Sequence, residues 1–329
     1  MTKTAFVLVA VLGIYLFYAQ AQAPVPDADA QEVLIGCVPQ GDQPLKLALE
    51  DISSKGLTPV SLTPIADEAI EYVLVFDKSK NALAHHGKAE LTLSRLMLHS
   101  LIRPGKDIGS LVLFDAGVLA ARGYTTNPDE ILASLEKIRP GESGFSLLDA
   151  LAAAAKKLDE MGTNRPRMII VVASKPIADY SSDASSNRTL ALADLLISSH
   201  TLLVAAESFS LADAAADRLQ LRRYNGGEVD VAAPVGKSPY QSGDEPLLNE
   251  LSGNVGGRVL RVSSESESDI LKQSGKDLDR LAAAVHSLYW LRLQPREGSQ
   301  GTVRLNLKAK AHCTLLAPSQ LRISITKPR

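Results

Sequence analysis

The chain has 329 residues, of which 45% are hydrophobic, 22% are charged and 5% are aromatic. These proportions are typical of a soluble globular protein of about two domains, and they exclude a disordered chain, a collagen-like repeat and a multi-span membrane protein. With 35 basic against 37 acidic side chains and a formal charge of −2, the chain has no basic excess to hold a polyanion, so we expect no nucleic-acid partner.

The first 21 residues have the order of a secretory signal peptide. Lys3 gives a positive start, Ala5–Tyr18 is an apolar run of 14 residues, and Ala19-Gln20-Ala21 supplies the small residues of a cleavage site. The apolar run is too short to cross a bilayer, which needs about 20 helical residues. We therefore expect export to the periplasm or the extracellular space, with no membrane span after cleavage and residues 22–30 as a linker.

Residues 31–66 alternate short apolar runs with prolines and glycines, which predicts a β segment with one helical stretch over 45–52. From Tyr72 onward, continuous apolar runs predict buried parallel strands, and apolar residues at helical spacing predict helices between them. The expected strands are 72–76, 110–114 with 118–121 beside it, 168–172, 201–205 and 258–262. The expected helices are 90–102, 128–138, 147–161, 190–198, 211–222, 247–252 and 270–286, with a surface loop over 225–245.

This alternation predicts an α/β fold over 67–286, in which a doubly wound and mostly parallel sheet has helices on both faces. The tail, 287–329, shows strand patterns at 288–293, 302–309 and 321–326 with no helix between them. We expect these strands to pack with 31–66 into a small antiparallel β layer formed by the two chain ends.

The chain has two cysteines, Cys37 near its start and Cys313 near its end. In an exported protein an even pair favours a disulfide, and the predicted β layer brings the two positions towards each other. Two buried free thiols remain the alternative.

Three short stretches lie where strands or loops meet helices: Asp77-Lys78-Ser79-Lys80-Asn81, Gly144-Phe145-Ser146 before Leu147-Leu148-Asp149-Ala150-Leu151, and Ala173-Ser174-Lys175. Together with the order of elements, they resemble a von Willebrand factor A-like domain. A narrower resemblance, to secreted bacterial proteins called VWFA-related, rests on the stretch from Leu248 to Arg258 and on Leu288-Tyr289-Trp290-Leu291. The resemblance as a whole covers roughly residues 70–329.

The resemblance implies a metal-ion-dependent adhesion site, in which strand-end oxygens hold Mg²⁺ or Mn²⁺. Here the site is degenerate, because serine replaces the second aspartate, phenylalanine replaces the threonine, and lysines crowd the rim. Affinity for such cations depends on the charge of the ligands, so we expect no metal and no other cofactor. If a metal were bound, its ligands would be Asp77, Ser79 and Asn81.

One stretch resembles an enzyme motif. Gly141-Glu142-Ser143-Gly144 is similar to the start of the nucleophile elbow of serine hydrolases, but it follows a helix instead of a strand. A hydrolase that uses Ser143 is therefore the weaker alternative. His85 and His86 lie in an expected loop, with no carboxylate spaced to orient them, and we expect no enzymatic activity.

We therefore expect an exported, non-enzymatic protein-binding or adhesion-type module that recognises an extracytoplasmic protein. In open parallel sheets, ligands bind at the carboxyl edge. A metal-dependent ligand-binding domain is the alternative. The candidate contact residues are Asp77, Ser79, Asn81, Ser146 and Ser174, with Lys78, Lys80 and Lys175 around them.

Overall fold

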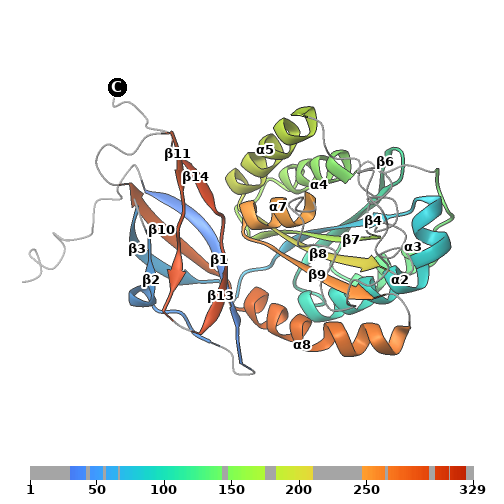
Figure 1. The fold of residues 1–329 in the computed structure, drawn as a ribbon, viewed down its shortest axis with the longest axis horizontal. Helices are drawn as coiled ribbons and strands as arrows, with labels where there is room; N and C mark the ends of the chain where they lie inside the picture. Colours follow the sequence, from blue (N-terminus) through green and yellow to red (C-terminus); the bar gives the residue numbers. More distant parts are fainter. Residues whose placement is uncertain are drawn as a thin grey trace, which may run out of the picture.

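The computed structural model describes residues 30–41, 45–54, 57–65, 67–142, 147–174, 183–209, 247–263, 266–295, 301–310 and 312–323. The predicted signal peptide, the expected helix 211–222 and the expected loop 225–245 lie outside these residues. The described chain forms an α/β unit and a smaller β unit that lie side by side (Figure 1). Among the described residues, no helix has the length and apolar character of a membrane span.

A six-stranded sheet forms the centre of the α/β unit. Its order is β6-β5-β4-β7-β8-β9, and every neighbouring pair is parallel except β5 with β6. Strand β4, which lies between β5 and β7, is buried along its whole length, as its continuous apolar run predicts. The strands are β4 (Glu71–Asp77), β5 (Ile108–Phe114), β6 (Val118–Thr125), β7 (Arg167–Ser174), β8 (Thr201–Phe209) and β9 (Arg258–Ser263).

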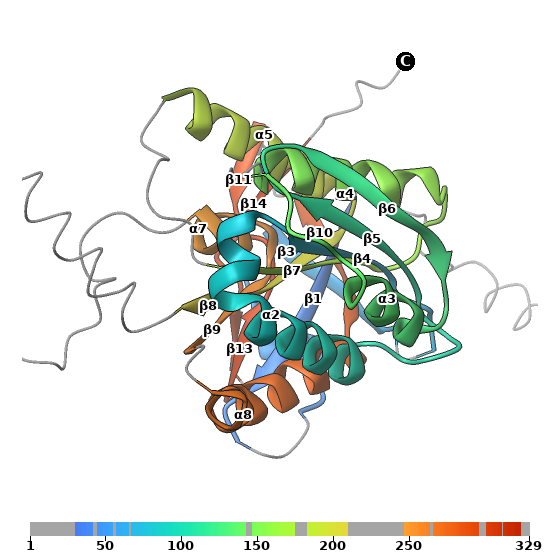
Figure 2. The same ribbon diagram turned by 90° about the vertical axis from the view of Figure 1, so that its right-hand side faces the viewer.

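Helices cover both faces of this sheet (Figures 1 and 2). One face packs against α2 (Lys80–Leu101), α3 (Pro128–Leu135) and α8 (Glu267–His286). The other packs against α4 (Leu147–Glu160), α5 (Asp183–Ser198) and α7 (Leu247–Val255). The doubly wound, mostly parallel α/β architecture predicted from the sequence is thus confirmed.

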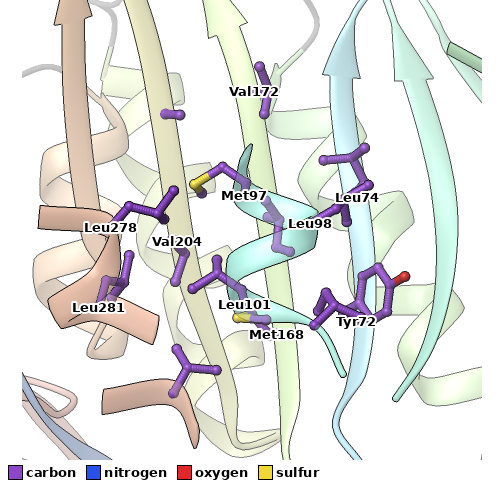
Figure 3. Close-up of a cluster of buried hydrophobic side chains, with 14 of the residues drawn as sticks. Tyr72, Leu74, Met97, Leu98, Leu101, Met168, Val172, Val204, Leu278 and Leu281 are labelled. Atoms are coloured by element: carbon purple, nitrogen blue, oxygen red, sulfur yellow. The ribbon is translucent and has the colours of Figure 1, made fainter. Parts of the chain in front are cut away.

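Alternate side chains of the strands form the core beneath α2. Figure 3 shows Met97, Leu98 and Leu101 of α2 packed over Leu74 of β4 and Val172 of β7. Successive residues of a strand point to opposite faces, so every second residue of β7 and β8 reaches this helix. This alternation decides which polar residues α2 meets at the strand ends.

The β unit joins the two ends of the chain. Its main sheet is antiparallel with the order β13-β1-β10-β3, from β13 (Cys313–Leu316), β1 (Gln31–Pro39), β10 (Tyr289–Pro295) and β3 (Leu57–Pro64). Two smaller pairs are β11 (Gly301–Arg304) with β14 (Gln320–Ile323), and β12 (Lys308–Ala309) with β2 (Ile52–Ser53). The predicted antiparallel layer from both chain ends is therefore confirmed.

A disulfide joins Cys37 of β1 to Cys313 of β13, with 5.7 Å between their Cα atoms. Antiparallel pairing of the two strands brings the cysteines together, because Pro39 is in register with Cys313. The bond therefore links two segments that are 276 residues apart in sequence.

Four local expectations were wrong, and one of them is the start of the helix expected over 190–198, which begins at Asp183. The helical stretch over 45–52 is only a 3-10 turn, η1 (Leu49–Asp51). The single strand over 302–309 is split into β11 and β12. The first helix of the α/β unit begins at Lys80 and not at Glu90, because the Ser79 side chain caps the helix at that point. The polar residues between Lys80 and Glu90 therefore form its first turns.

Candidate functional site

Parallel strands end at one edge of the sheet, and there the structure brings together two residues expected at the site. Asp77 is the last residue of β4, and Ser174 is the last residue of the neighbouring strand β7. The Ser174 hydroxyl donates a hydrogen bond of 3.4 Å to Oδ2 of Asp77. The pairing of the strands, and not their distance in sequence, places these two groups in contact.

Asp77 and Ser79 organise the start of α2. The backbone N–H of Ser79 donates to Oδ1 of Asp77 at 2.8 Å, and the Ser79 hydroxyl accepts from the backbone N–H of Ala82 at 3.3 Å. Ser79 is thus the N-cap of the helix, a position that serine favours because its oxygen satisfies an otherwise unpaired amide. The hydroxyl that the resemblance assigns to a metal therefore takes part in helix capping.

The Asp77 carboxyl is buried, with 1% of its surface exposed. Burial raises its pKa above the ordinary value because the charged form loses its hydration, while hydrogen bonds from Ser79 and Ser174 partly oppose the rise. The nearby Asp115 charge also raises the pKa of Asp77.

Lys78 pairs with Asp115, a residue that sequence reasoning did not select. The ammonium of Lys78 binds the Asp115 carboxylate, which also accepts backbone N–H groups from Gly117 at 2.9 Å and Glu142 at 3.1 Å. Gly141 donates its N–H to the Lys78 carbonyl at 2.8 Å. These contacts form what we call the strand-end clasp: Lys78, Asp115, Gly141 and Glu142.

The clasp neutralises one of the rim lysines. Asp115 pairs with Lys78, whose side chain is only 18% exposed. Lys80, the first residue of α2, is exposed. Of the rim lysines that the structure describes, Lys80 alone therefore offers its charge to the solvent.

The side chain of Asn81 and the whole of Ser143, Ser146 and Lys175 lie outside the described residues. Their expected roles stay predictions. His85 and His86 were expected in a loop, and this was wrong: both lie in α2, where His86 is buried with 8% exposure.

A second buried carboxyl belongs to α2. Glu90 has no exposed surface, and the backbone N–H of Ser174 lies close enough to lower its pKa in part. Burial raises the pKa of Glu90 well above its ordinary value, and the charge of Asp77 raises it further. The spacing of Glu90 from Met97 and Leu101, seven and eleven residues, is the sequence signal that places it on the core side of the helix.

The edge residues named by the resemblance do not fit an exposed divalent cation. Among the residues of this set that the structure describes, only Asp77 supplies a carboxylate, and the Ser79 hydroxyl caps α2. Within the described residues, no group of three or more histidine, cysteine, aspartate and glutamate side chains is arranged to hold a metal ion. Hard cations favour several oxygen ligands that include carboxylates, so this set is poor in charge.

Comparison with solved structures finds similar chains at low identity. The conserved hypothetical protein BatB from Bacteroides thetaiotaomicron is 16% identical, with a TM-score of 0.41 over 65% of this chain and 99% of its own. Proximal thread matrix protein 1 from the mussel byssus, solved with a zinc-occupied MIDAS motif, is 13% identical, with a TM-score of 0.42 over 72% of this chain and 49% of its own.

A von Willebrand factor type A protein from Catenulispora acidiphila is 10% identical, with a TM-score of 0.45 over 83% of this chain and 72% of its own. No protein-family model and no curated protein matches the chain. Identities this low carry no function across, so the chemistry of the site rests on the residues of this chain. By its strand order and its helix-covered faces, the α/β unit is a doubly wound α/β domain, the architecture that the resemblance to von Willebrand factor A-like domains implies.

Proposed function

We propose that this chain is an exported, non-enzymatic module that binds an extracytoplasmic protein at the carboxyl edge of its central sheet. The observation that carries the proposal is the strand-end clasp, which fixes the loops after β4 and β5 to each other and to the segment after α3. A rigid edge lowers the entropy that is lost when a partner binds.

The charge at this edge points to the chemistry of the partner. Because Asp115 neutralises Lys78, the exposed ammonium of Lys80 is the group that a partner meets first among the described rim lysines. An acidic surface on the partner suits this arrangement. Complementary charge of this kind raises the rate of association and selects between partners.

The hydrolase alternative rests on Ser143, which lies outside the described residues. A nucleophilic serine needs a base within hydrogen-bond reach. Labelling of the chain by a serine-directed probe, lost in Ser143→Ala, would favour the hydrolase over the binding module.

The binding proposal is tested with the exported chain on a support, exposed to envelope extract of its host. We expect one partner to be retained in stoichiometric amount and to bind at least about tenfold more weakly to Lys80→Glu, because the charge that meets it is reversed. The matched control is Lys156→Glu, another exposed lysine of the α/β unit, near the end of α4. Equal binding by the two variants, or no stoichiometric partner, would contradict the proposal.

A further inference from the structure

We propose that the groove between α5 and the β unit binds an extended peptide segment of a partner protein, which pairs with the open edge of β1 and carries a lysine or arginine beside an apolar side chain. The groove lies at the amino end of the central sheet, because His200, which lines it, directly precedes β8. It is therefore separate from the carboxyl edge, and the proposal does not rest on the proposed function.

The groove is formed by segments of both units, and Figure 1 shows α5 beside β14. It has a volume of about 690 Å³, within the range of about 300–1,000 Å³ that is typical of ligand sites. One wall is α5. The other wall consists of the start of β1, Arg292 of β10 and the start of β14.

The sequence of α5 serves the core and the groove with different faces. Leu192, Ala193 and Leu196 are buried in the core beneath the helix. The residues on the groove side follow the spacing i, i+3, i+4, i+7 of a single helix face, and they are Ala191, Asp194, Leu195 and Ser198. Leu195 is 39% exposed, so this face offers the groove an apolar side chain next to an acidic one.

The edge of β1 is open along the groove. β13 pairs with β1 only over Gly36–Pro39, and β10 takes the opposite edge of β1 over Gln31–Ile35. Among the described strands, none pairs with the first half of β1 on the side of β13, and residues 30–32 of this half line the groove. An open strand edge presents unpaired N–H and C=O groups, and an extended peptide binds such an edge by adding a strand to it.

The charges on the two walls favour a basic peptide. Glu32 of β1 and Asp194 of α5 are exposed, and in the part of the chain that the structure describes neither forms an ion pair with a lysine or arginine. Arg292 lies opposite Glu32 in the pairing of β1 with β10, but it has a partner of its own. Burial lowers the pKa of His200 below its ordinary 6.5, so its ring is uncharged at neutral pH and does not offset the carboxylates.

The apolar and acidic side chains of the groove together define the peptide. Successive side chains of an extended chain point to opposite sides, so a peptide with alternating basic and apolar residues presents one kind of side chain on each side. Main-chain hydrogen bonds to β1 supply affinity in this mode of binding, and the side chains supply specificity. The groove therefore suits a short segment in which a basic residue neighbours an apolar one.

The test uses a fluorescently labelled hexapeptide of alternating lysine and valine with both ends blocked, and fluorescence anisotropy measures its binding to the exported chain. The matched peptide has glutamate in place of lysine. We expect the lysine peptide to bind at least about tenfold more tightly than the glutamate peptide, because only the first complements the carboxylates of the groove.

Charge reversal locates the site. Asp194→Lys should weaken binding of the lysine peptide at least about tenfold. The matched control is Asp277→Lys, which changes an exposed aspartate of α8 on the opposite face of the central sheet. Both variants should melt with the wild type, because exposed substitutions change stability little. Lys80→Glu, at the carboxyl edge, should bind the peptide as the wild type does, which separates this groove from the edge assigned to the proposed function.

Methylation of the peptide backbone tests the strand pairing. In an extended chain the N–H groups of alternate residues point to the same side, so methylation of every valine nitrogen, or of every lysine nitrogen, removes the donors from one edge of the peptide. At least one of the two methylated peptides should bind about tenfold more weakly than the unmodified one, because the edge that meets β1 has lost its donors.

The proposal is overturned by a wild type that binds the lysine peptide no better than the glutamate peptide, or by equal binding to Asp194→Lys and Asp277→Lys. It is also overturned if both methylated peptides bind as tightly as the unmodified one, which would indicate attraction to a charged surface without strand pairing. Light scattering gives the last outcome: a wild type that is dimeric, with a monomeric Asp194→Lys, would place a second copy of this chain in the groove instead of a partner peptide.

Discussion

Lys78 and Asp115 form an ion pair across the carboxyl edge of the sheet, each one residue beyond the end of its strand. Strands β4 and β5 are parallel neighbours, with Asp77 in register with Phe114, so the two following residues face each other. The pair is mostly buried, with side-chain exposures of 18% and 10%. It fixes the geometry of the edge that we assign to partner binding.

Removing the charge of Asp115 should loosen this edge. Asp115→Asn leaves Lys78 without a counter-charge and weakens the bonds from Gly117 and Glu142, so we expect a loss of about 1–3 kcal/mol in the free energy of unfolding. Urea unfolding at pH 7 measures it. An unchanged midpoint would mean that solvent satisfies the lysine equally well.

The contribution of Asp115 should depend on pH in a defined direction. The Lys78 hydrogen bond, followed by those from the backbone amides of Gly117 and Glu142, lowers the pKa of Asp115 from its ordinary 3.8 to about 2. Since the folded state favours the ionised form, the stabilisation is complete above pH 3.8 and is lost as the pH falls through 2. The stability difference between wild type and Asp115→Asn should therefore be constant from pH 7 to about 4 and shrink below it. A difference that fades at higher pH would contradict this assignment.

Gly141 should tolerate no side chain. A Cβ atom at this position would lie 2.0 Å from Oδ2 of Asp115 and 2.6 Å from Nζ of Lys78, so Gly141→Ala displaces the ion pair. We expect a loss of about 1–3 kcal/mol from overpacking. Gly123→Ala is the control, because a Cβ there has no neighbour within 4 Å. Equal melting temperatures for the two variants would show that the clasp is not packed in this way.

Reducing the disulfide should destabilise the β unit. Cys37 and Cys313 close a loop of 276 residues, and loss of a native disulfide typically costs about 2–5 kcal/mol. We expect a reductant to lower the melting temperature of the wild type and to leave that of a double variant, Cys37→Ala with Cys313→Ala, unchanged. Thiol titration of the unreduced, unfolded chain should find no free thiol, and two free thiols would refute the pairing.

His200 connects the two units and should make their stability sensitive to mild acid. Its ring meets Trp290 of β10 edge-on, with 5.1 Å between the ring centroids. Burial lowers the pKa of His200 below its ordinary 6.5, because the charged form loses its hydration. The folded state thus disfavours protonation, and stability present above pH 6.5 is lost as the pH falls through the lowered pKa.

A variant isolates this effect. His200 has a backbone φ of 52°, a left-handed conformation that asparagine tolerates better than most residues. His200→Asn should therefore keep the backbone, lose about 1 kcal/mol of ring packing, and show a flatter decline of melting temperature between pH 8 and pH 5. Parallel declines in the two proteins would exclude His200 as the responsible group.

The amino-acid sequence alone was sufficient to predict the order and class of most of the described elements of the α/β unit. The run Tyr72–Phe76 consists of apolar residues without alternation, which fits a strand buried on both faces, and the structure buries all of it. Asn127 stands before Pro128, a pair typical of a helix start, and its side chain accepts the N–H of Asp129. These features are local, because burial and capping depend on residues that are near in sequence.

The site required the tertiary structure. Lys78 and Asp115 are 37 residues apart, and only the pairing of β4 with β5 makes them neighbours. The sequence predicts a helix over 90–102, because nothing near Glu90 shows that α2 begins ten residues earlier, at Lys80. The sequence does not specify the environment of an ionisable side chain. The folded structure sets its partners and its burial, and these decide whether the group is paired and whether it is protonated.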